Sequence, residues 1–160
     1  MKKKVMVAGT FDILHPGHIY LIDKAAELGD VYVVVATDKN RKRFSGDTPT
    51  VPEEQRLEVV KHIKNVKDAR LGRSDNDTLK TVAEIDPDII LLGPDQQHSI
   101  QDLKDGLKEL GLGDVKVERL TTYYDKYPLH SSSKIKEKII KNHKLKEEDC
   151  NGKGDPSKFR

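Results

Sequence analysis

Short β-branched segments alternate with longer amphipathic segments along the chain. VYVVVA and IILLG are unbroken apolar runs, typical of strands that are buried on both faces of a sheet. Between such runs, apolar side chains recur at helical spacing, as at Ile19, Ile22 and Ala26. This alternation is typical of βαβ units. Strands are expected at about 4–10, 31–36, 68–72, 88–93 and 115–120, and helices at about 16–28, 53–64, 77–84, 99–110 and 131–142.

The predicted fold class is α/β, a Rossmann-like open parallel sheet of about five strands with helices on both faces. A chain of 160 residues is sized for a single domain. This domain is expected to span 1–143 and to be followed by a flexible tail at 144–160, because the tail is polar and lacks periodicity. The segment TDKNRKRFSGDTPTVP at 37–52 is predicted to be a long loop, because it is polar and contains Gly and Pro.

Composition narrows the class of protein further. The chain has 29 basic and 27 acidic residues, so its formal charge of +2 provides no broad basic field for nucleic-acid binding. No apolar run approaches the roughly 18 residues of a membrane span, and no signal-peptide core follows MKKK, so a cytoplasmic protein is expected. The single cysteine, Cys150, excludes an intramolecular disulfide and a Cys-based zinc site.

The first expected strand–helix junction, GTFDILHPGH at 9–18, carries the densest candidate chemistry. Ligands of open α/β sheets bind beyond the carboxyl ends of the strands, where a helix N-terminus offers free N–H groups to a phosphate. Gly9 would let the backbone approach such a ligand closely. The chain has no GxxxxGK[ST], and no GxGxxG follows its first strand, which excludes a P-loop and a dinucleotide fingerprint. A phosphate site of another kind is therefore expected.

His15 and His18 in this junction admit three interpretations. They could share a metal ion, although helical zinc pairs are usually spaced i, i+4 and no Cys or Glu is placed to complete the site. They could cap and pack the start of the helix. They could also donate hydrogen bonds to a polyphosphate and offset the charge that develops when pyrophosphate leaves. The third is preferred because a strand and Gly9 precede the pair and Pro16 marks the start of a helix. Asp12 fits a ligand contact or an Asx turn equally well.

GTFDILHPGH resembles the HxGH signature of the cytidylyltransferase-like nucleotidyltransferase superfamily. LHSSSKI at 129–135 resembles the IS[ST][ST]xI segment of the same superfamily, in which hydroxyl groups at a helix start contact nucleotide phosphates. LLGPDQ at 91–96 and PEEQR at 52–56 resemble two further segments, so that the resemblance covers nearly the whole chain except the tail. It implies nucleotide-binding roles for Gly9, Thr10, Phe11, Gly93, Asp95, Ser131, Ser132 and Ser133.

Within the superfamily, the chain is most similar to the archaeal FAD synthases. The resemblance implies transfer of AMP from ATP to FMN, giving FAD and pyrophosphate. Glycerol-3-phosphate cytidylyltransferases usually read WGH and RTxGIS, whereas this chain has Pro16 in its first motif and Lys126 where their arginine would stand. A cytidylyltransferase acting on glycerol 3-phosphate, ethanolamine phosphate or a sugar phosphate remains an alternative. A non-catalytic nucleotide-binding module is an alternative of another class.

The resemblance also assigns roles and partners. His15 and His18 are the expected catalytic residues, with His18 stabilising the departing oxygen, and Ser131 and Ser132 are expected at the β and γ phosphates. Mg²⁺ or another divalent cation is expected to arrive with ATP, with no metal ligand assigned to the protein. ATP and FMN are the expected partners, without nucleic acid or membrane, and a homodimer is consistent with the family. Candidate phosphate contacts are Lys42, Arg56 and Lys126.

Overall fold

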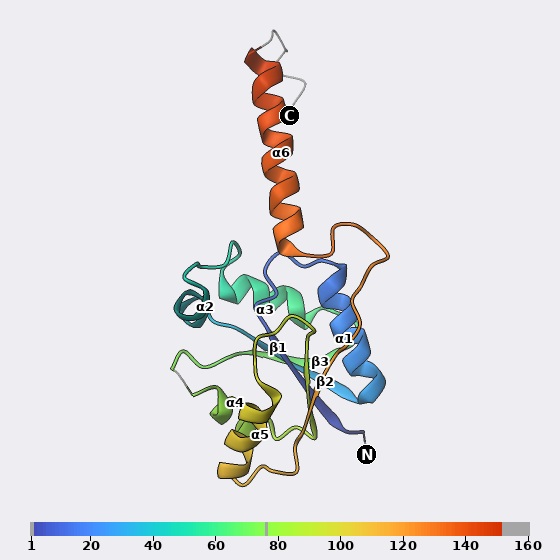
Figure 1. The fold of residues 1–160 in the computed structure, drawn as a ribbon, viewed down its shortest axis with the longest axis vertical. Coiled ribbons are helices and arrows are strands. Elements are labelled where there is room, and N and C mark those ends of the chain that lie inside the picture. Colours follow the sequence, from blue (N-terminus) through green and yellow to red (C-terminus); the bar gives the residue numbers. More distant parts are fainter. Residues whose placement is uncertain (1, 76, 152–160) are drawn as a thin grey trace.

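Five parallel strands form the centre of the molecule, in a computed structural model that describes residues 2–75 and 77–151 (Figure 1). Their order across the sheet is β3-β2-β1-β4-β5. β1 lies in the middle, with Val5 beside Val31 of β2 and beside Ile89 of β4. The fold class and all five predicted strands are confirmed, with ends that differ by up to two residues. The strands are β1 (Lys4–Gly9), β2 (Asp30–Val35), β3 (Val66–Leu71), β4 (Ile89–Leu92) and β5 (Lys116–Arg119).

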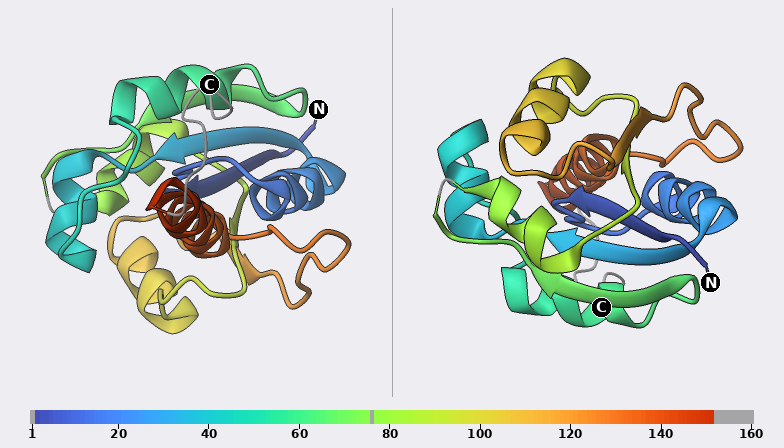
Figure 2. Two further views of the ribbon diagram at one scale, coloured as in Figure 1. Left: turned by 90° about the horizontal axis from the view of Figure 1, so that it is seen from above. Right: turned by 90° about the horizontal axis from the view of Figure 1, so that it is seen from below.

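Two pairs of helices cover the two faces of the sheet (Figure 2). On one face, Ile22 of α1 (Pro16–Leu28) and Val60 of α3 (Glu53–Lys61) are fully buried against β1 and β2. On the other face, Val82 of α4 (Thr78–Ile85) and Leu107 of α5 (Ile100–Glu109) pack against Met6 of β1 and its neighbours. Alternate residues of one strand therefore enter two separate cores. This layering confirms the prediction of helices on both faces.

The two ends of α1 are where the sequence places them. Pro16 occupies the first turn, where its missing N–H costs no hydrogen bond. Gly29 is required by close packing, because a Cβ at this position would lie 2.2 Å from the carbonyl oxygen of Lys3. The backbone of Asp30 then donates to the same Lys3 oxygen at 2.8 Å, which starts β2 beside β1. The helix is thereby held with its N-terminus at the carboxyl end of β1.

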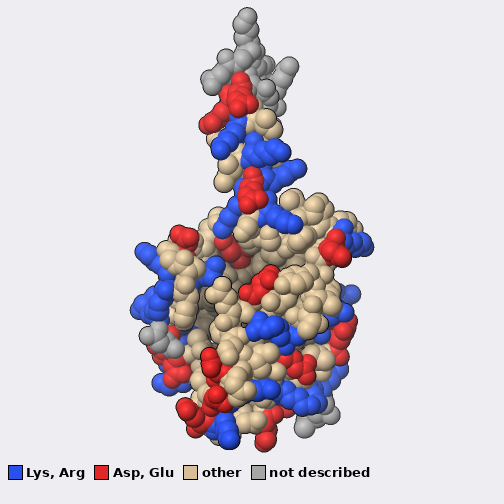
Figure 3. Space-filling model, in the orientation of Figure 1, with Lys and Arg blue, Asp and Glu red and all other residues tan. Residues whose placement is uncertain are grey.

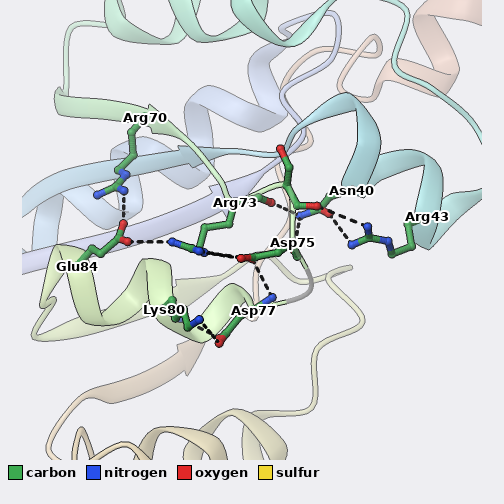
Figure 4. Close-up of polar contacts among 9 residues, drawn as sticks. Asn40, Arg43, Arg70, Arg73, Asp75, Asp77, Lys80 and Glu84 are labelled. Carbon is green, nitrogen blue, oxygen red and sulfur yellow. Dashed lines mark hydrogen bonds and ion pairs between the residues drawn. The ribbon is translucent and has the colours of Figure 1, made fainter.

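Residues 38–45 form a helix, α2 (Asp38–Ser45), where the sequence predicts only a long loop. Thr37 caps it by accepting from the N–H of Asn40 at 3.1 Å, and Gly46 ends it in the left-handed conformation. The side-chain amide of the buried Asn40 donates to the backbone oxygens of Arg73 and Asp75 (Figure 4). A polar helix of two turns is therefore stabilised by tertiary hydrogen bonds, which hydrophobic periodicity does not report.

The segment after β3 that receives Asn40 is itself fixed by ion pairs (Figure 4). Arg73 binds Asp75 at 2.7 Å and Glu84 of α4 at 3.2 Å. Arg70 pairs with the same Glu84. The hydrogen bond from Arg73 lowers the pKa of Asp75 to about 2. These contacts tie α2, the end of β3 and α4 together beside the carboxyl edge of the sheet.

The C-terminal helix, α6 (Ser132–Asn151), is longer than the predicted 131–142 and stands away from the body (Figure 1). The expected boundary between 143 and 144 falls inside this helix, which includes residues 144–151. The part of the expected tail at 152–160 lies outside the described residues. Side chains from 136 to 148 are exposed, and Lys side chains gather along this helix (Figure 3). Among the described helices, none is both long and apolar enough to cross a membrane.

The strand order places a topological switch point between β1 and β4. The chain proceeds from β1 toward one edge of the sheet and returns through β4 toward the other. Loops that leave these two strands diverge and create a crevice at their carboxyl ends. The loops are GTFDILH after β1 and GPDQQHS after β4, which are two of the segments that the sequence singles out.

Candidate active site

His15 and His18 cap the N-terminus of α1, and each uses its Nδ1 atom to do so. His15 Nδ1 accepts from the backbone N–H of Gly17 at 3.1 Å, and His18 Nδ1 accepts from the backbone N–H of His15 at 3.4 Å. The two rings stack, with centroids 3.7 Å apart. A neutral imidazole whose Nδ1 accepts must carry its proton on Nε2. The capping interpretation is therefore correct, and it leaves an Nε2–H donor on each ring.

The surroundings of both rings favour the neutral imidazole. Burial lowers the pKa of His18 to about 3, the neighbouring His15 contributes, and Asp12 opposes the shift. Burial, followed by the charge of His130, lowers the pKa of His15. A polyphosphate placed beside these rings would favour their protonated forms, because an opposite charge raises the pKa of a histidine. The pair therefore offers hydrogen-bond donors at first and positive charge as negative charge develops.

The loop between β1 and α1 follows an unusual backbone path. Phe11 and Ile13 both have left-handed conformations, with φ of 55° and 51°. Non-glycine residues in this region are strained and concentrate at functional sites. The buried ring of Phe11 lies 5.2 Å from that of His18 and would be 3.0 Å from a Cβ at residue 9, a contact so close that the ring would have to shift. This path begins where β1 ends at Gly9 and leads to the N-terminus of α1.

Asp12 is buried and fastens the loop to two other segments. Its carboxylate accepts from the backbone N–H groups of Thr50 and Val51 at 2.8 and 2.9 Å, and it pairs with Lys136 of α6 at 3.5 Å. Burial alone would raise the pKa of Asp12, but these hydrogen bonds and the lysine lower it. The Asx-turn interpretation is wrong, because both backbone donors lie more than 35 residues away in sequence. Asp12 is a structural anchor.

The N-terminus of α6 meets the same loop. Ser132 Oγ donates to the backbone oxygen of Asp12, and Ser131 Oγ accepts from the N–H of Lys134 at 3.2 Å and so caps the helix. Gly17 lies against the backbone oxygen of His130, where a Cβ would be 2.6 Å from that atom. The glycine of HPGH is thus required for this contact. Two helix N-termini, each with a positive dipole end, converge on one crevice.

Arg56, predicted as a candidate phosphate contact, is instead built into the protein. Its side chain is 1% exposed. The guanidinium donates to the backbone oxygens of Thr10 at 2.6 Å and Val51 at 2.8 Å, and it pairs with Asp38 at 2.7 Å. These bonds explain the role of PEEQR. Its arginine holds the backbone of the loop after β1 at Thr10 and joins this loop to α2 through Asp38.

Gly93 and Asp95 lie in the loop after β4, at the other side of the crevice. The side chain of Gln96 spans from this loop to β1, accepting from Gly93 N–H at 2.6 Å and donating to Ala8 O at 3.0 Å. The carboxylate of Asp95 accepts from the hydroxyl of Tyr123 at 2.9 Å, which raises the pKa of that phenol. Asp95 therefore faces the segment that leads to α6.

The remaining candidates are less tightly placed. Lys42 is an exposed residue of α2, Ser133 is exposed at the start of α6, and the Lys126 ammonium lies 5.3 Å from the centre of the Tyr127 ring.

Beside the histidines, a surface pocket of about 500 Å³ lies on the outer face of α1. Its lining includes Leu14, His15, Pro16, Ile19, Tyr20, Tyr124 and Tyr127. Within the described ranges, no group of three or more His, Cys, Asp or Glu side chains could hold a metal ion.

Sequence reasoning missed Lys136 and Arg119. Lys136, the partner of Asp12, lies one turn beyond the serine run. In the sequence it cannot be distinguished from the other lysines of α6. Arg119, the last residue of an edge strand, binds the loop that carries Asp95. The only available signal was position, because the carboxyl end of a strand in an open parallel sheet faces the ligand crevice.

Comparison with known proteins agrees with this arrangement. A family described as cytidylyltransferase-like matches residues 6–138. The FAD synthase of Methanobrevibacter smithii is 47% identical over 87% of this chain and 92% of its own length, and that of Pyrococcus horikoshii is 42% identical over 86% and 93%. Among solved structures, the lipopolysaccharide core biosynthesis protein of Thermoplasma volcanium is 40% identical, covers 78% of this chain and all of its own, and has a TM-score of 0.73. The chain is a nucleotidyltransferase and belongs to the cytidylyltransferase-like family.

Proposed function

We propose that this chain is an FMN adenylyltransferase, which transfers AMP from ATP to FMN and so produces FAD and pyrophosphate. FAD synthases from five archaea are between 42% and 47% identical to it over most of both chains. The observation that carries the proposal in this structure is the histidine pair. His15 and His18 present Nε2–H groups where the N-termini of α1 and α6 meet. Such a site suits a triphosphate better than an uncharged ligand.

In the proposed reaction, a phosphate oxygen of FMN attacks the α-phosphorus of ATP. A new P–O bond forms as the bond from the α-phosphorus to the bridging oxygen breaks, and pyrophosphate leaves with that electron pair. His18, and His15 beside it, donate Nε2–H hydrogen bonds to the oxygens that gain charge. These donors are pre-oriented by their Nδ1 bonds to the backbone, so they need little rearrangement during the reaction. The step requires no covalent enzyme intermediate.

Other residues of the crevice would position the nucleotide. The backbone of Gly9, Thr10 and Phe11 would line the phosphates. Ser131 and Ser133 at the start of α6 would donate to the β and γ phosphates, and Ser132 would do so by exchanging its bond to the Asp12 oxygen. Lys42 and Lys126 would supply further charge if their flexible side chains turn inward.

A divalent cation, Mg²⁺ or a similar ion, would enter with the triphosphate and neutralise part of its charge. The donor set of the crevice, which consists of imidazole N–H groups, serine hydroxyls and backbone N–H groups, suits phosphate oxygens rather than a cation. The residues therefore fit a cation that is held mainly by the substrate.

The test is a screen of donors against acceptors that records pyrophosphate release. ATP with FMN and Mg²⁺ should give FAD, identified by chromatography, with CTP and small phosphorylated acceptors much less active. Turnover of CTP with glycerol 3-phosphate, but not of ATP with FMN, would overturn the proposal. Tight ATP binding without pyrophosphate release against any acceptor would instead indicate a binding module.

A further inference from the structure

Arg119, the last residue of the edge strand β5, gathers the backbone of a neighbouring loop. Its guanidinium donates to the backbone oxygen of Gly93 at 3.3 Å and to those of Gln96 and His98. All three oxygens belong to the loop that joins β4 to α5. A planar guanidinium has several N–H groups in a fixed fork, and so it can bind diverging carbonyls that a single ammonium cannot serve together.

This loop is held from both sides of β4. The Gln96 side chain attaches it to Ala8 of β1, while the Gln96 backbone oxygen is bound by Arg119 of β5. Asp95 lies between Gly93 and Gln96, the two nearest residues whose oxygens Arg119 binds. The position of the Asp95 backbone is therefore fixed from each flank, and its carboxylate is directed toward Tyr123.

The bonding of the half-buried Arg119 differs from that of Arg56, the buried arginine at this edge. Arg56 is neutralised by Asp38, whereas Arg119 forms no ion pair with any side chain in the described part of the chain. Holding a half-buried cation on carbonyl groups alone costs desolvation that an ion pair would offset. The three carbonyl bonds therefore fix the conformation of the loop at some cost in folding free energy.

The N-termini of α1 and α6 suit the phosphates, which leaves the loop after β4 for the ribose and base. We infer that Arg119 is a positioning residue for the nucleotide, acting through Asp95 of this loop on the ribose and base rather than touching the phosphates itself. The inference rests on the proposed function in that the ligand at this loop is taken to be a nucleoside triphosphate. Its donors are turned toward the loop backbone, so the loop, and not the guanidinium, faces the ligand. On this inference, β5 contributes to nucleotide recognition through the loop that Arg119 holds, and not through its own contact with the nucleotide.

The test compares ATP with inorganic tripolyphosphate, a ligand that has the phosphates but neither ribose nor base. In calorimetric titrations without acceptor, Arg119→Lys should weaken ATP binding about tenfold, the factor expected for about 1.4 kcal/mol of lost loop alignment. Binding of tripolyphosphate should change less than twofold, and in turnover assays KM for ATP should rise while kcat is retained. Arg70→Lys, near the end of the opposite edge strand, is the matched control and should leave both ligands unaffected.

A double-mutant cycle separates action through Asp95 from other effects. In an Asp95→Asn background, Arg119→Lys should weaken ATP binding less than twofold, because the group that Arg119 positions has been changed. A full tenfold loss in that background would overturn the inference. Equal weakening of ATP and tripolyphosphate would overturn it as well, because it would indicate direct phosphate contact, and so would ATP binding that is unchanged in Arg119→Lys.

A measurement on the unchanged protein covers the case in which Arg119→Lys unfolds. ATP should slow amide hydrogen exchange in residues 93–98 more than tripolyphosphate does, and equal protection by both ligands would refute the inference. Because every binding measurement omits the acceptor, failure of the proposed function appears separately, as a wild-type protein that binds ATP but forms no FAD.

Discussion

The stacked rings of His15 and His18, with centroids 3.7 Å apart, are each bound to the backbone through Nδ1. One arrangement thus caps a helix and sets the tautomer of the two histidines that the proposed function uses as phosphate donors. Capping and phosphate binding are alternative interpretations of the histidine pair, but they use different atoms of the same rings. The cap uses Nδ1, and the proposed phosphate contact uses Nε2. The capping bonds fix the orientation of each ring and therefore of its Nε2–H group.

His18→Ala is therefore expected to reduce turnover far more than it reduces stability. Loss of a pre-oriented donor to developing charge lowers kcat by about 10²- to 10³-fold, whereas loss of a cap costs about 1 kcal/mol of unfolding free energy. Pyrophosphate release and thermal unfolding measure the two effects. His62→Ala, on the exposed end of α3, is the control and should match the wild type. Near-normal turnover in His18→Ala would remove His18 from the mechanism.

The neutral state of His18 predicts acid sensitivity of the fold. Its pKa is about 3 in the folded protein and 6.5 in the unfolded chain, so between these values only the unfolded chain binds the proton. The unfolding free energy should therefore decrease as pH falls from about 6.5 toward 3, with a slope of about 1.4 kcal/mol per pH unit for this proton. Urea unfolding across this range measures the slope.

His18→Gln separates this contribution from those of His15 and Asp12. Glutamine at this position can still accept from the N–H of His15, as in a capping box, but it does not titrate. The variant should lose stability less steeply with acid, by about one proton. Equal slopes in the two proteins would show that His18 is protonated in the folded state.

Asp12→Asn should destabilise the protein and displace α6. The amide has one oxygen for the two backbone donors of Thr50 and Val51, and it loses the charge that pairs with Lys136. An unsatisfied buried donor costs about 1–3 kcal/mol.

Lys136→Met, which removes only the half-exposed partner of Asp12, should lower the free energy of unfolding by less than about 1 kcal/mol and raise KM for ATP a few-fold. Lys138→Met, an exposed lysine on the same helix, is the matched control; an equal effect there would exclude a specific role for Lys136.

How far the sequence predicts this molecule depends on where its stabilising contacts lie. α1 is predicted to the residue because its apolar face, Pro16 and Gly29 are all local signals. α2 is missed because it buries Asn40 alone and is fixed by atoms more than 30 residues away. The full length of α6 is missed because a helix exposed beyond its first turn has no buried face to create periodicity.

The same distinction applies to the site. Motifs locate the residues to which the proposed function assigns ligand contacts, since GTFDILHPGH and HSSSKI are contiguous in sequence. The residues that hold the first motif come from distant elements, as Thr50, Val51 and Lys136 do for Asp12. Sequence alone also placed Arg56 with the ligand contacts, although its bonds are all to the protein. A charged residue beside a motif can support the motif instead of the substrate.

Arg56→Lys tests that reassignment of Arg56. A lysine cannot bind Thr10, Val51 and Asp38 at once, so at least one buried acceptor or the Asp38 charge loses its partner. The unfolding free energy should fall by about 2–4 kcal/mol. Because the loop after β1 loses its support, KM for ATP and KM for FMN should rise together, and the difference from the wild type should stay the same at high ionic strength. An Arg56→Lys protein of unchanged stability that is weakened for ATP alone, with a difference from the wild type that shrinks at high salt, would return Arg56 to the phosphate contacts. Denaturant unfolding and steady-state kinetics at two salt concentrations separate these outcomes.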